Sequence, residues 1–150
     1  MDKKLRVTLY WAMMAICVAG TAKASLIANG SFEAGVYIGD PYLQTLSTSN
    51  GPNAISGWTV TGGSIDWTTT LLWQASDGAK SLDLAGSNNG TIISDAFDTV
   101  VGQSYVVTFD MAGNPARTYD KELSVTAGET VRNFTFDQGD QHSFLNMGWT

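Results

Sequence analysis

Alternation of apolar and polar residues is the feature that most limits what this sequence can fold into. After Ser25, no stretch keeps an apolar period of 3.6 residues for three turns, as an amphipathic helix would. A period of two recurs instead, most clearly over Ser104–Ala112. One face of that stretch would carry the side chains of Tyr105, Val107, Phe109 and Met111. The pattern predicts an all-β chain.

Further strands are predicted where β-branched and aromatic residues alternate between turns that contain glycine or asparagine. These segments are Lys80–Leu84, Thr91–Phe97, Lys121–Ala127, Val131–Asp137 and the shorter Leu26–Ala28, Trp58–Val60 and Ile65–Thr68. About eight short strands with frequent turns are typical of an antiparallel β-sandwich or jelly roll. Two long stretches, 34–55 and 113–120, are predicted to be irregular loops.

The same alternation predicts which side chains form the core. Besides the four residues named above, the inward-facing set is Leu82, Leu84, Leu123, Val125, Phe134 and Phe136. Ser81 and Asp83 would then face solvent, because successive side chains of a strand point to opposite faces. Trp58 is also expected in the core.

The first 24 residues have the organisation of a signal peptide. Met1–Arg6 is short and basic, Val7–Gly20 is an uncharged apolar run of 14 residues, and Ala22–Ala24 offers small residues for cleavage. Cleavage is predicted before Ser25, which leaves one domain over residues 25–150, secreted or held at the cell surface. The apolar run is shorter than the roughly 20 residues that span a bilayer, so the mature chain is expected to have no membrane span. A retained membrane anchor is the alternative.

The charge balance of the predicted mature chain excludes several classes of function. Its 126 residues carry 4 basic and 13 acidic side chains, a net charge of −9, whereas a nucleic-acid partner requires a basic surface. The one cysteine, Cys17, lies in the leading segment, so disulfides and thiolate catalysis are excluded as well. His142 is the one histidine, which is too few for a zinc site.

Seven short motifs, taken in order, give the sequence a resemblance to a known family. They are Asn29–Glu33, Ile55–Val60, Ser64–Trp67, Ala75–Gly78, Ser81–Gly86, Gly102–Tyr105 and Phe109–Asn114. Together they resemble the choice-of-anchor C domain of exported bacterial proteins, which is related to the DUF642 cell-wall proteins. The resemblance covers about residues 25–150. It implies a galactose-binding-like jelly roll, the fold of many carbohydrate-binding modules.

The resemblance also implies that strands are missing from the sequence. Domains of this family continue past the position of Trp149-Thr150 with further strands and a closing segment, so we expect this chain to lack its last strands. A jelly roll without them would have unpaired strand edges and uncovered apolar faces. Such a chain is expected to be marginally stable, prone to aggregation or dependent on a strand from a partner.

The resemblance implies that Glu33 binds a metal ion. In calcium-stabilised carbohydrate-binding jelly rolls, a matching glutamate and nearby carbonyl oxygens hold one structural Ca²⁺, which prefers six to eight oxygen ligands. The family partner of this glutamate is an aspartate of the closing strand. The alternative is that Glu33 simply begins a loop.

Aromatic residues supply the candidate ligand contacts. Sugar rings stack their C–H faces on aromatic planes, while neighbouring carboxylates and amides bind their hydroxyl groups. Trp67 and Trp73 flank a polar run and could face either the core or a ligand, Tyr42 lies in the long loop, and Asp77 lies in a turn. These four are the predicted ligand-binding residues, and the predicted ligand is a polysaccharide or cell-wall glycan.

The sequence contains no motif that indicates catalysis. Glycoside hydrolysis needs two carboxyl groups roughly 5–10 Å apart, and Asp66, Asp77 and Asp83 are candidates only because they are acidic. We therefore predict a non-catalytic exported domain that binds carbohydrate, with no cofactor besides the structural Ca²⁺. The alternatives are a structural or adhesive surface domain without a small ligand and, less favoured, a glycoside hydrolase.

Overall fold

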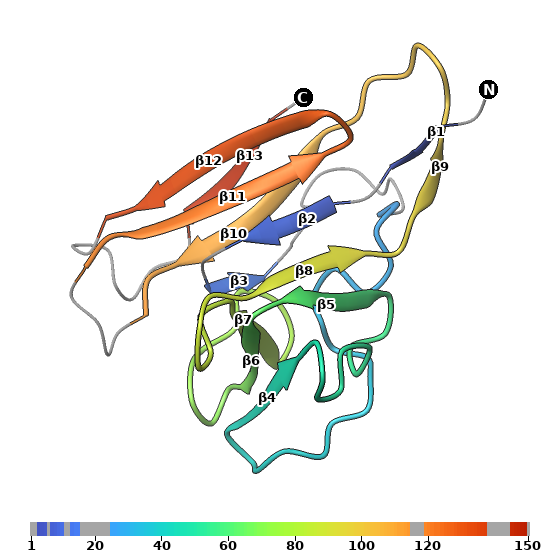
Figure 1. Ribbon diagram of the computed structural model, residues 1–150. Helices are drawn as coiled ribbons and strands as arrows, with labels where there is room; N and C mark the ends of the chain where they lie inside the picture. The colour runs from blue at the N-terminus through green and yellow to red at the C-terminus, as the bar shows by residue number, and fades with distance from the viewer. Residues whose placement is uncertain are drawn as a thin grey trace.

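The computed structural model describes residues 3–5, 7–10, 13–15, 25–114, 119–137 and 145–149, with side chains for 25–114 and 119–137. Within these ranges every regular element is a β-strand (Figure 1). The strands are β1 (Lys3–Leu5), β2 (Val7–Tyr10), β3 (Met13–Ala15), β4 (Leu43–Ser47), β5 (Trp58–Gly62), β6 (Ser64–Thr69), β7 (Lys80–Asp83), β8 (Thr91–Ser94), β9 (Phe97–Thr99), β10 (Val107–Ala112), β11 (Lys121–Ala127), β12 (Thr130–Phe136) and β13 (Leu145–Trp149). The prediction of an all-β chain is confirmed. A helix of the length and apolarity needed to cross a membrane does not occur in the described part of the chain.

Two antiparallel sheets form the body of the fold. The larger sheet has the order β13-β10-β3-β7-β6-β4, and the second has the order β12-β11-β2-β8-β5. A separate two-stranded pair joins β1 to β9. All of these pairings are antiparallel, which agrees with the predicted antiparallel β-sandwich and jelly-roll class.

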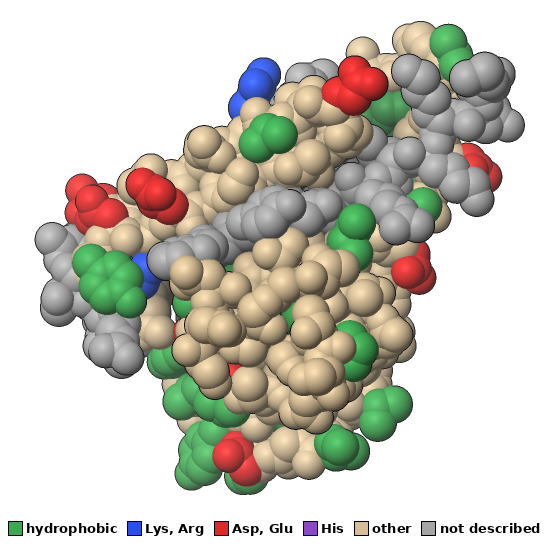
Figure 2. Space-filling model, viewed as in Figure 1, with side chains coloured by type: hydrophobic (Ala, Val, Ile, Leu, Met, Phe, Trp, Pro, Cys, Tyr) green, Lys and Arg blue, Asp and Glu red, His purple; other side chains and the backbone are tan. Residues whose placement is uncertain are grey.

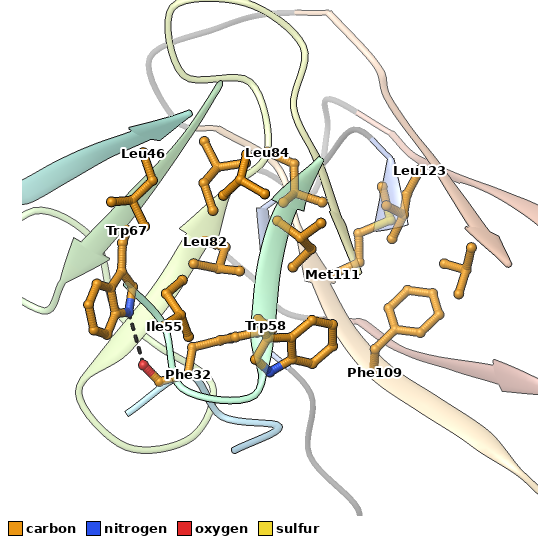
Figure 3. Packing of buried hydrophobic residues seen from close by; sticks show 14 of the residues in the cluster. Phe32, Leu46, Ile55, Trp58, Trp67, Leu82, Leu84, Phe109, Met111 and Leu123 are labelled. Atoms are coloured by element: carbon orange, nitrogen blue, oxygen red, sulfur yellow. Dashed lines mark hydrogen bonds between the residues drawn. The ribbon is translucent and has the colours of Figure 1, made fainter. Parts of the chain in front are cut away.

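A hydrophobic core is shared by the inner faces of both sheets (Figure 3). Seven of the ten predicted core residues are fully buried, namely Leu82, Leu84, Phe109, Met111, Leu123, Val125 and Phe136. Val107 and Phe134 are partly buried against this cluster, and Trp58 lies within it as predicted. The period-two pattern therefore identifies the inner faces of β7, β10 and β11 correctly.

Tyr105 is an exception to the predicted core. The strand that was predicted to start at Ser104 starts at Val107, and Tyr105 precedes it. Its side chain is only partly buried, and its hydroxyl accepts a hydrogen bond of 2.7 Å from the N–H of Val100. A phenol hydroxyl favours such a polar position over the centre of a core.

Three segments differ from the predicted strand pattern. The predicted loop 34–55 contains β4, whose alternation buries only Gln44 and Leu46 and is therefore weak in the sequence. The predicted strand Thr91–Phe97 is divided into β8 and β9. Leu26–Ala28 forms no strand and leads into a turn in which Asn29 has a left-handed φ of 53°.

The prediction that Ser81 and Asp83 face solvent is wrong. Both side chains are buried on the face of β7 opposite to Leu82 and Leu84. Ser81 Oγ lies 2.8 Å from Thr68 Oγ1 on the neighbouring strand β6, and the Thr68 hydroxyl is also buried. Hydrogen bonding compensates for burial here, so a polar residue in a strand does not mark an exposed face.

The described residues of the predicted signal peptide lie in strands of this full chain. β2 pairs with β8 and β11, β3 pairs with β7 and β10, and β1 pairs with β9. Pairing in the full chain does not test cleavage, so cleavage before Ser25 stays a prediction. Cys17 and His142 lie outside the described residues.

Candidate functional site

The predicted ligand-binding residues lie around two loops at one end of the larger sheet. Residues 36–42, before β4, and residues 70–79, between β6 and β7, form what we call the aromatic end. Thr69 joins the loops, because its N–H donates to the carbonyl oxygen of Tyr42 at 2.9 Å and its hydroxyl donates to that of Pro41 at 2.6 Å. The N–H of Thr70 donates to the carbonyl oxygen of Ala79 at 3.1 Å. Thr69, the last residue of β6, is thus bonded to the first loop, and the two ends of the second loop are bonded to each other.

The motif Asn29–Glu33 positions one side of this end. Phe32 is fully buried and has an unusual left-handed φ of 62°, a conformation that the surrounding packing must stabilise. The next side chain, that of Glu33, reaches the start of β7. Its Oε1 accepts hydrogen bonds from the N–H groups of Ala79 at 2.9 Å and Lys80 at 2.8 Å. Glu33 therefore fixes the turn that follows Asp77.

Gly78 shows how closely Glu33 approaches this turn. Its φ is +69°, and a Cβ atom at this position would lie 2.5 Å from Glu33 Oε1. The turn therefore requires glycine, both for its backbone conformation and for the room that the carboxylate occupies. This role of Glu33 was not visible in the sequence, because its partners are 46 and 47 residues away.

Calcium binding by Glu33 stays a prediction. Calcium takes six to eight oxygen ligands, whereas Oε1 of this carboxylate already faces two amide donors. Among the residues that the structure describes, no group of three or more His, Cys, Asp or Glu side chains is arranged to hold a metal ion. The carboxylate thus acts here as a cap of backbone amides.

Trp67 lies in the core and does not form part of a ligand surface. Its side chain is 0 % exposed, and its Nε1–H donates to the carbonyl oxygen of Phe32 at 2.9 Å (Figure 3). The ring is also covered by Tyr37, with ring centroids 5.1 Å apart, and by Lys80, whose Nζ lies 4.0 Å from the ring centroid. A ring enclosed in this way has no free face for a sugar, so we remove Trp67 from the predicted ligand contacts.

Lys80 and Tyr37 cover the buried tryptophan at the border of the aromatic end. The Lys80 ammonium lies 4.7 Å from the centroid of the Tyr37 ring as well, an arrangement that favours a cation through the ring quadrupoles. Lys80 is not among the site residues predicted from the sequence. It could have been singled out because it is one of only 4 basic residues after Ser25.

Tyr42 and Trp73 are the predicted aromatic contact residues that are not fully buried at this end. The Tyr42 side chain is 51 % exposed, and the Trp73 side chain is partly buried. The Trp73 N–H donates to the carbonyl oxygen of Thr69 at 3.1 Å, and Thr69 bonds to Tyr42 as described above. Asp77 is exposed in the same loop as Trp73. Three of the four predicted ligand-binding residues therefore lie on one hydrogen-bonded pair of loops.

Asp40 fixes the backbone beside Tyr42. Its Oδ1 accepts hydrogen bonds from the N–H groups of Tyr42 at 2.8 Å and Leu43 at 2.9 Å, and these bonds lower the pKa of the Asp40 carboxyl. The Tyr37 hydroxyl donates to the Asp40 carbonyl oxygen at 2.9 Å, and burial raises the pKa of that phenol. Tyr42 is thus presented from an ordered turn, which lowers the entropy cost of binding through it.

Both loops also expose apolar side chains to solvent. Val36, Ile38 and Leu71 are all more than half exposed. Figure 2 shows hydrophobic side chains, with acidic ones among them, at the end of the molecule where β4 lies. These three residues are the large aliphatic side chains that the two loops leave exposed to solvent.

A second polar group lies on the outer face of the larger sheet, away from the core. Asp66 and Asp83 are directly opposite each other on β6 and β7. Asp66 accepts a hydrogen bond of 2.6 Å from the Thr45 hydroxyl. Asp83 accepts bonds from the Ala85 N–H at 2.9 Å and from Asn114 Nδ2 at 3.1 Å. Asp77, the third acidic candidate, belongs instead to the aromatic end.

Burial dominates the titration of Asp83. Loss of solvent raises the pKa of this carboxyl, and the charge of Asp66 raises it further, whereas the bonds from Ala85 and Asn114 and the charge of Lys121 oppose the increase. A carboxyl group with a raised pKa is common at functional sites and also in buried structural networks. Both oxygens of the Asp83 carboxyl accept hydrogen bonds, which favours a structural role for this buried group.

Comparisons with known proteins place the chain in a family. Residues 25–150 match the family described as "Protein of unknown function (DUF642)". Halomucin from Haloquadratum walsbyi is 33 % identical over 92 residues, which make up 60 % of this chain and 1 % of halomucin. The chain therefore corresponds to a very small part of that relative. No solved structure matches the chain significantly. Because the family match extends over all residues from Ser25 onward, the chain belongs to the DUF642 family.

Proposed function

We propose that this chain is a non-catalytic exported domain that binds carbohydrate, a polysaccharide or cell-wall glycan, through its aromatic end. The observation that carries the proposal is the half-exposed Tyr42 ring on a loop that is hydrogen-bonded to the loop of Trp73 and Asp77. Aromatic rings and a carboxylate on neighbouring loops suit the apolar faces and hydroxyl groups of sugars. Within DUF642, we place the chain with the choice-of-anchor C domains, whose motifs it resembles.

Export is part of the same proposal. The basic start, the apolar run and the small residues up to Ala24 support secretion, with display at the cell surface or in the extracellular matrix. The similarity to a short part of halomucin supports a module that is used within longer proteins.

A structural or adhesive surface domain without a small ligand is the second candidate. The exposed aliphatic side chains of Val36, Ile38 and Leu71 favour it, because they suit contact with another protein rather than with a sugar. The two candidates can be distinguished by substitution of Tyr42 and Trp73, because weaker polysaccharide binding by these variants is expected only if the domain binds glycan.

Affinity electrophoresis of the full chain in gels containing different polysaccharides tests the proposal. Tyr42→Ala and Trp73→Ala should each weaken retardation by about fivefold, because stacking on a ring contributes about 1 kcal/mol. Tyr119→Ala is the matched control, since Tyr119 is also an exposed tyrosine but lies before β11 and carries Lys121 over its ring. Folded protein that no polysaccharide retards would contradict glycan binding and favour the adhesive alternative. Release of reducing ends would instead reveal a hydrolase.

A further inference from the structure

β2 and β3 each occupy an interior position, β2 in the second sheet and β3 in the larger sheet. β2 pairs with β11, Val7–Tyr10 lying opposite Ala127–Ser124, and its other edge pairs with β8 over Thr91–Ile93. β3 pairs with β10 over Asp110–Ala112 and with Leu82 and Asp83 of β7. Figure 1 shows β2, in blue, between β11 and β8. We call residues 7–15 the donor segment; its strands β2 and β3 thus join described strands that do not otherwise pair with each other.

Removal of the donor segment would divide each sheet into two parts. The second sheet would separate into β12-β11 and β8-β5, and the larger sheet into β13-β10 and β7-β6-β4. Four strands would then each present an unpaired edge in the middle of the domain. Buried backbone groups without partners are costly, and an open strand edge readily pairs with another strand.

We propose that residues 25–150 form a strand acceptor and that residues 7–15 are its intramolecular donor. The acceptor has two slots, one between β8 and β11, which β2 fills, and one between β7 and β10, which β3 fills. Main-chain hydrogen bonds on both edges give the affinity, as in other cases of strand addition. When the predicted leader is removed, these slots open and accept the same segment from solution.

The register also defines the chemistry of an acceptable donor. Its neighbours on β8 and β11 are uncharged, namely Thr91–Ile93 and Ser124–Ala127. Position 13 of the donor lies opposite Asp83, and position 15 lies opposite Asp110. Like charges directly opposite each other on paired strands are destabilising. An uncharged donor is therefore favoured, and a carboxylate at position 13 is disfavoured.

The test begins with the full chain, made without export so that the leader is retained, and with residues 17–22 replaced by a cleavage sequence for a specific protease. After folding and cleavage, we expect the donor piece to remain bound through size-exclusion chromatography and native mass spectrometry. After extraction of the donor in denaturant, the refolded body should lose hydrogen-exchange protection in β8 and β11. A synthetic peptide of residues 7–15 should restore that protection at a ratio of one to one.

Substituted peptides distinguish strand pairing from nonspecific apolar binding. A Leu9→Pro peptide, which lacks one ladder donor, should bind at least about tenfold more weakly. A Met13→Glu peptide should bind more weakly than its neutral counterpart Met13→Gln at pH 7. Equal binding of all four peptides would overturn the proposal.

Two further outcomes would also overturn it. The first is that cleavage releases the donor piece while β8 and β11 keep their protection. The second is that the body, refolded alone, is a protected monomer that does not bind the peptide. If the body alone self-associates, the peptide should convert the oligomers to one-to-one complexes, and failure to do so counts against a specific acceptor.

Discussion

Replacement of Trp67 by phenylalanine separates its role in the core from a role in ligand binding. The substitution removes the indole N–H that bonds to the Phe32 carbonyl oxygen at 2.9 Å, and leaving a buried acceptor unpaired costs about 1–3 kcal/mol. The smaller ring leaves a void that costs about 1 kcal/mol. A weaker interaction with Lys80, now 4.0 Å from the ring centroid, adds up to about 1 kcal/mol. The expected loss is about 2–5 kcal/mol, a large part of a typical net stability of 5–15 kcal/mol.

Equilibrium urea denaturation followed by circular dichroism measures this loss. Trp67→Phe should lower the denaturation midpoint while leaving polysaccharide binding per folded molecule unchanged. Trp73→Phe is the matched control, because Trp73 is only partly buried, and it should change stability by less than about 1 kcal/mol. A Trp67→Phe chain within about 0.5 kcal/mol of the wild type, or one with weaker glycan binding and unchanged stability, would refute the assignment of Trp67 to the core.

Three further predictions concern the core, the titration of the buried acid and export. Phe109→Ala should lower the free energy of unfolding by roughly 3–5 kcal/mol, because Phe109 is fully buried and packs edge-on against Phe134 with ring centroids 4.8 Å apart. An unchanged melting temperature would contradict the prediction that this face of β10 points inward. The pKa of folded Asp83 is raised above the ordinary 3.8, so stability is lost as the pH rises from about 3.8 through the raised value. The Asp83→Asn variant cannot titrate at this position and should keep its stability over this window. The difference between its urea midpoint and that of the wild type should therefore increase with pH, and parallel pH profiles of the two proteins would exclude the effect. Material secreted by the source organism should begin at Ser25 in N-terminal sequencing, and a start more than about three residues away would contradict the predicted cleavage.

Local patterns in the sequence predict the strands that are paired with their neighbours along the chain. Lys121–Ala127 was predicted with the bounds of β11, and the turn that follows leads directly into β12. Alternation is clear in β11 and at the end of β12, because Leu123, Val125 and Phe136 contact the core on one face of the hairpin. β4 was missed because its burial rests on one leucine and one glutamine, so its hydrophobic signal is small.

Long-range contacts explain the remaining differences. The burial of Asp83 depends on Asn114, 31 residues away, and the enclosure of Trp67 depends on Phe32, 35 residues away. Periodicity describes the two faces of one strand and cannot show which loops cover the outer face. For the candidate site, the sequence identified Tyr42, Trp73 and Asp77 by residue type, whereas the hydrogen bonds of Thr69 that bring their loops together follow from the fold.

The position of the leading strands has a consequence for the timing of synthesis. β2 and β3 are the earliest parts of the sandwich to be made, whereas their partners β10 and β11 begin roughly 100 residues later. At about 5–20 residues per second, the ribosome needs about 5–20 s to complete that interval. During this time, β2 and β3 cannot pair with β10 or β11, because those strands do not yet exist. The two sheets can therefore be completed only after β10 and β11 have been made, although the strands at their centres, β2 and β3, are among the first residues to be synthesised.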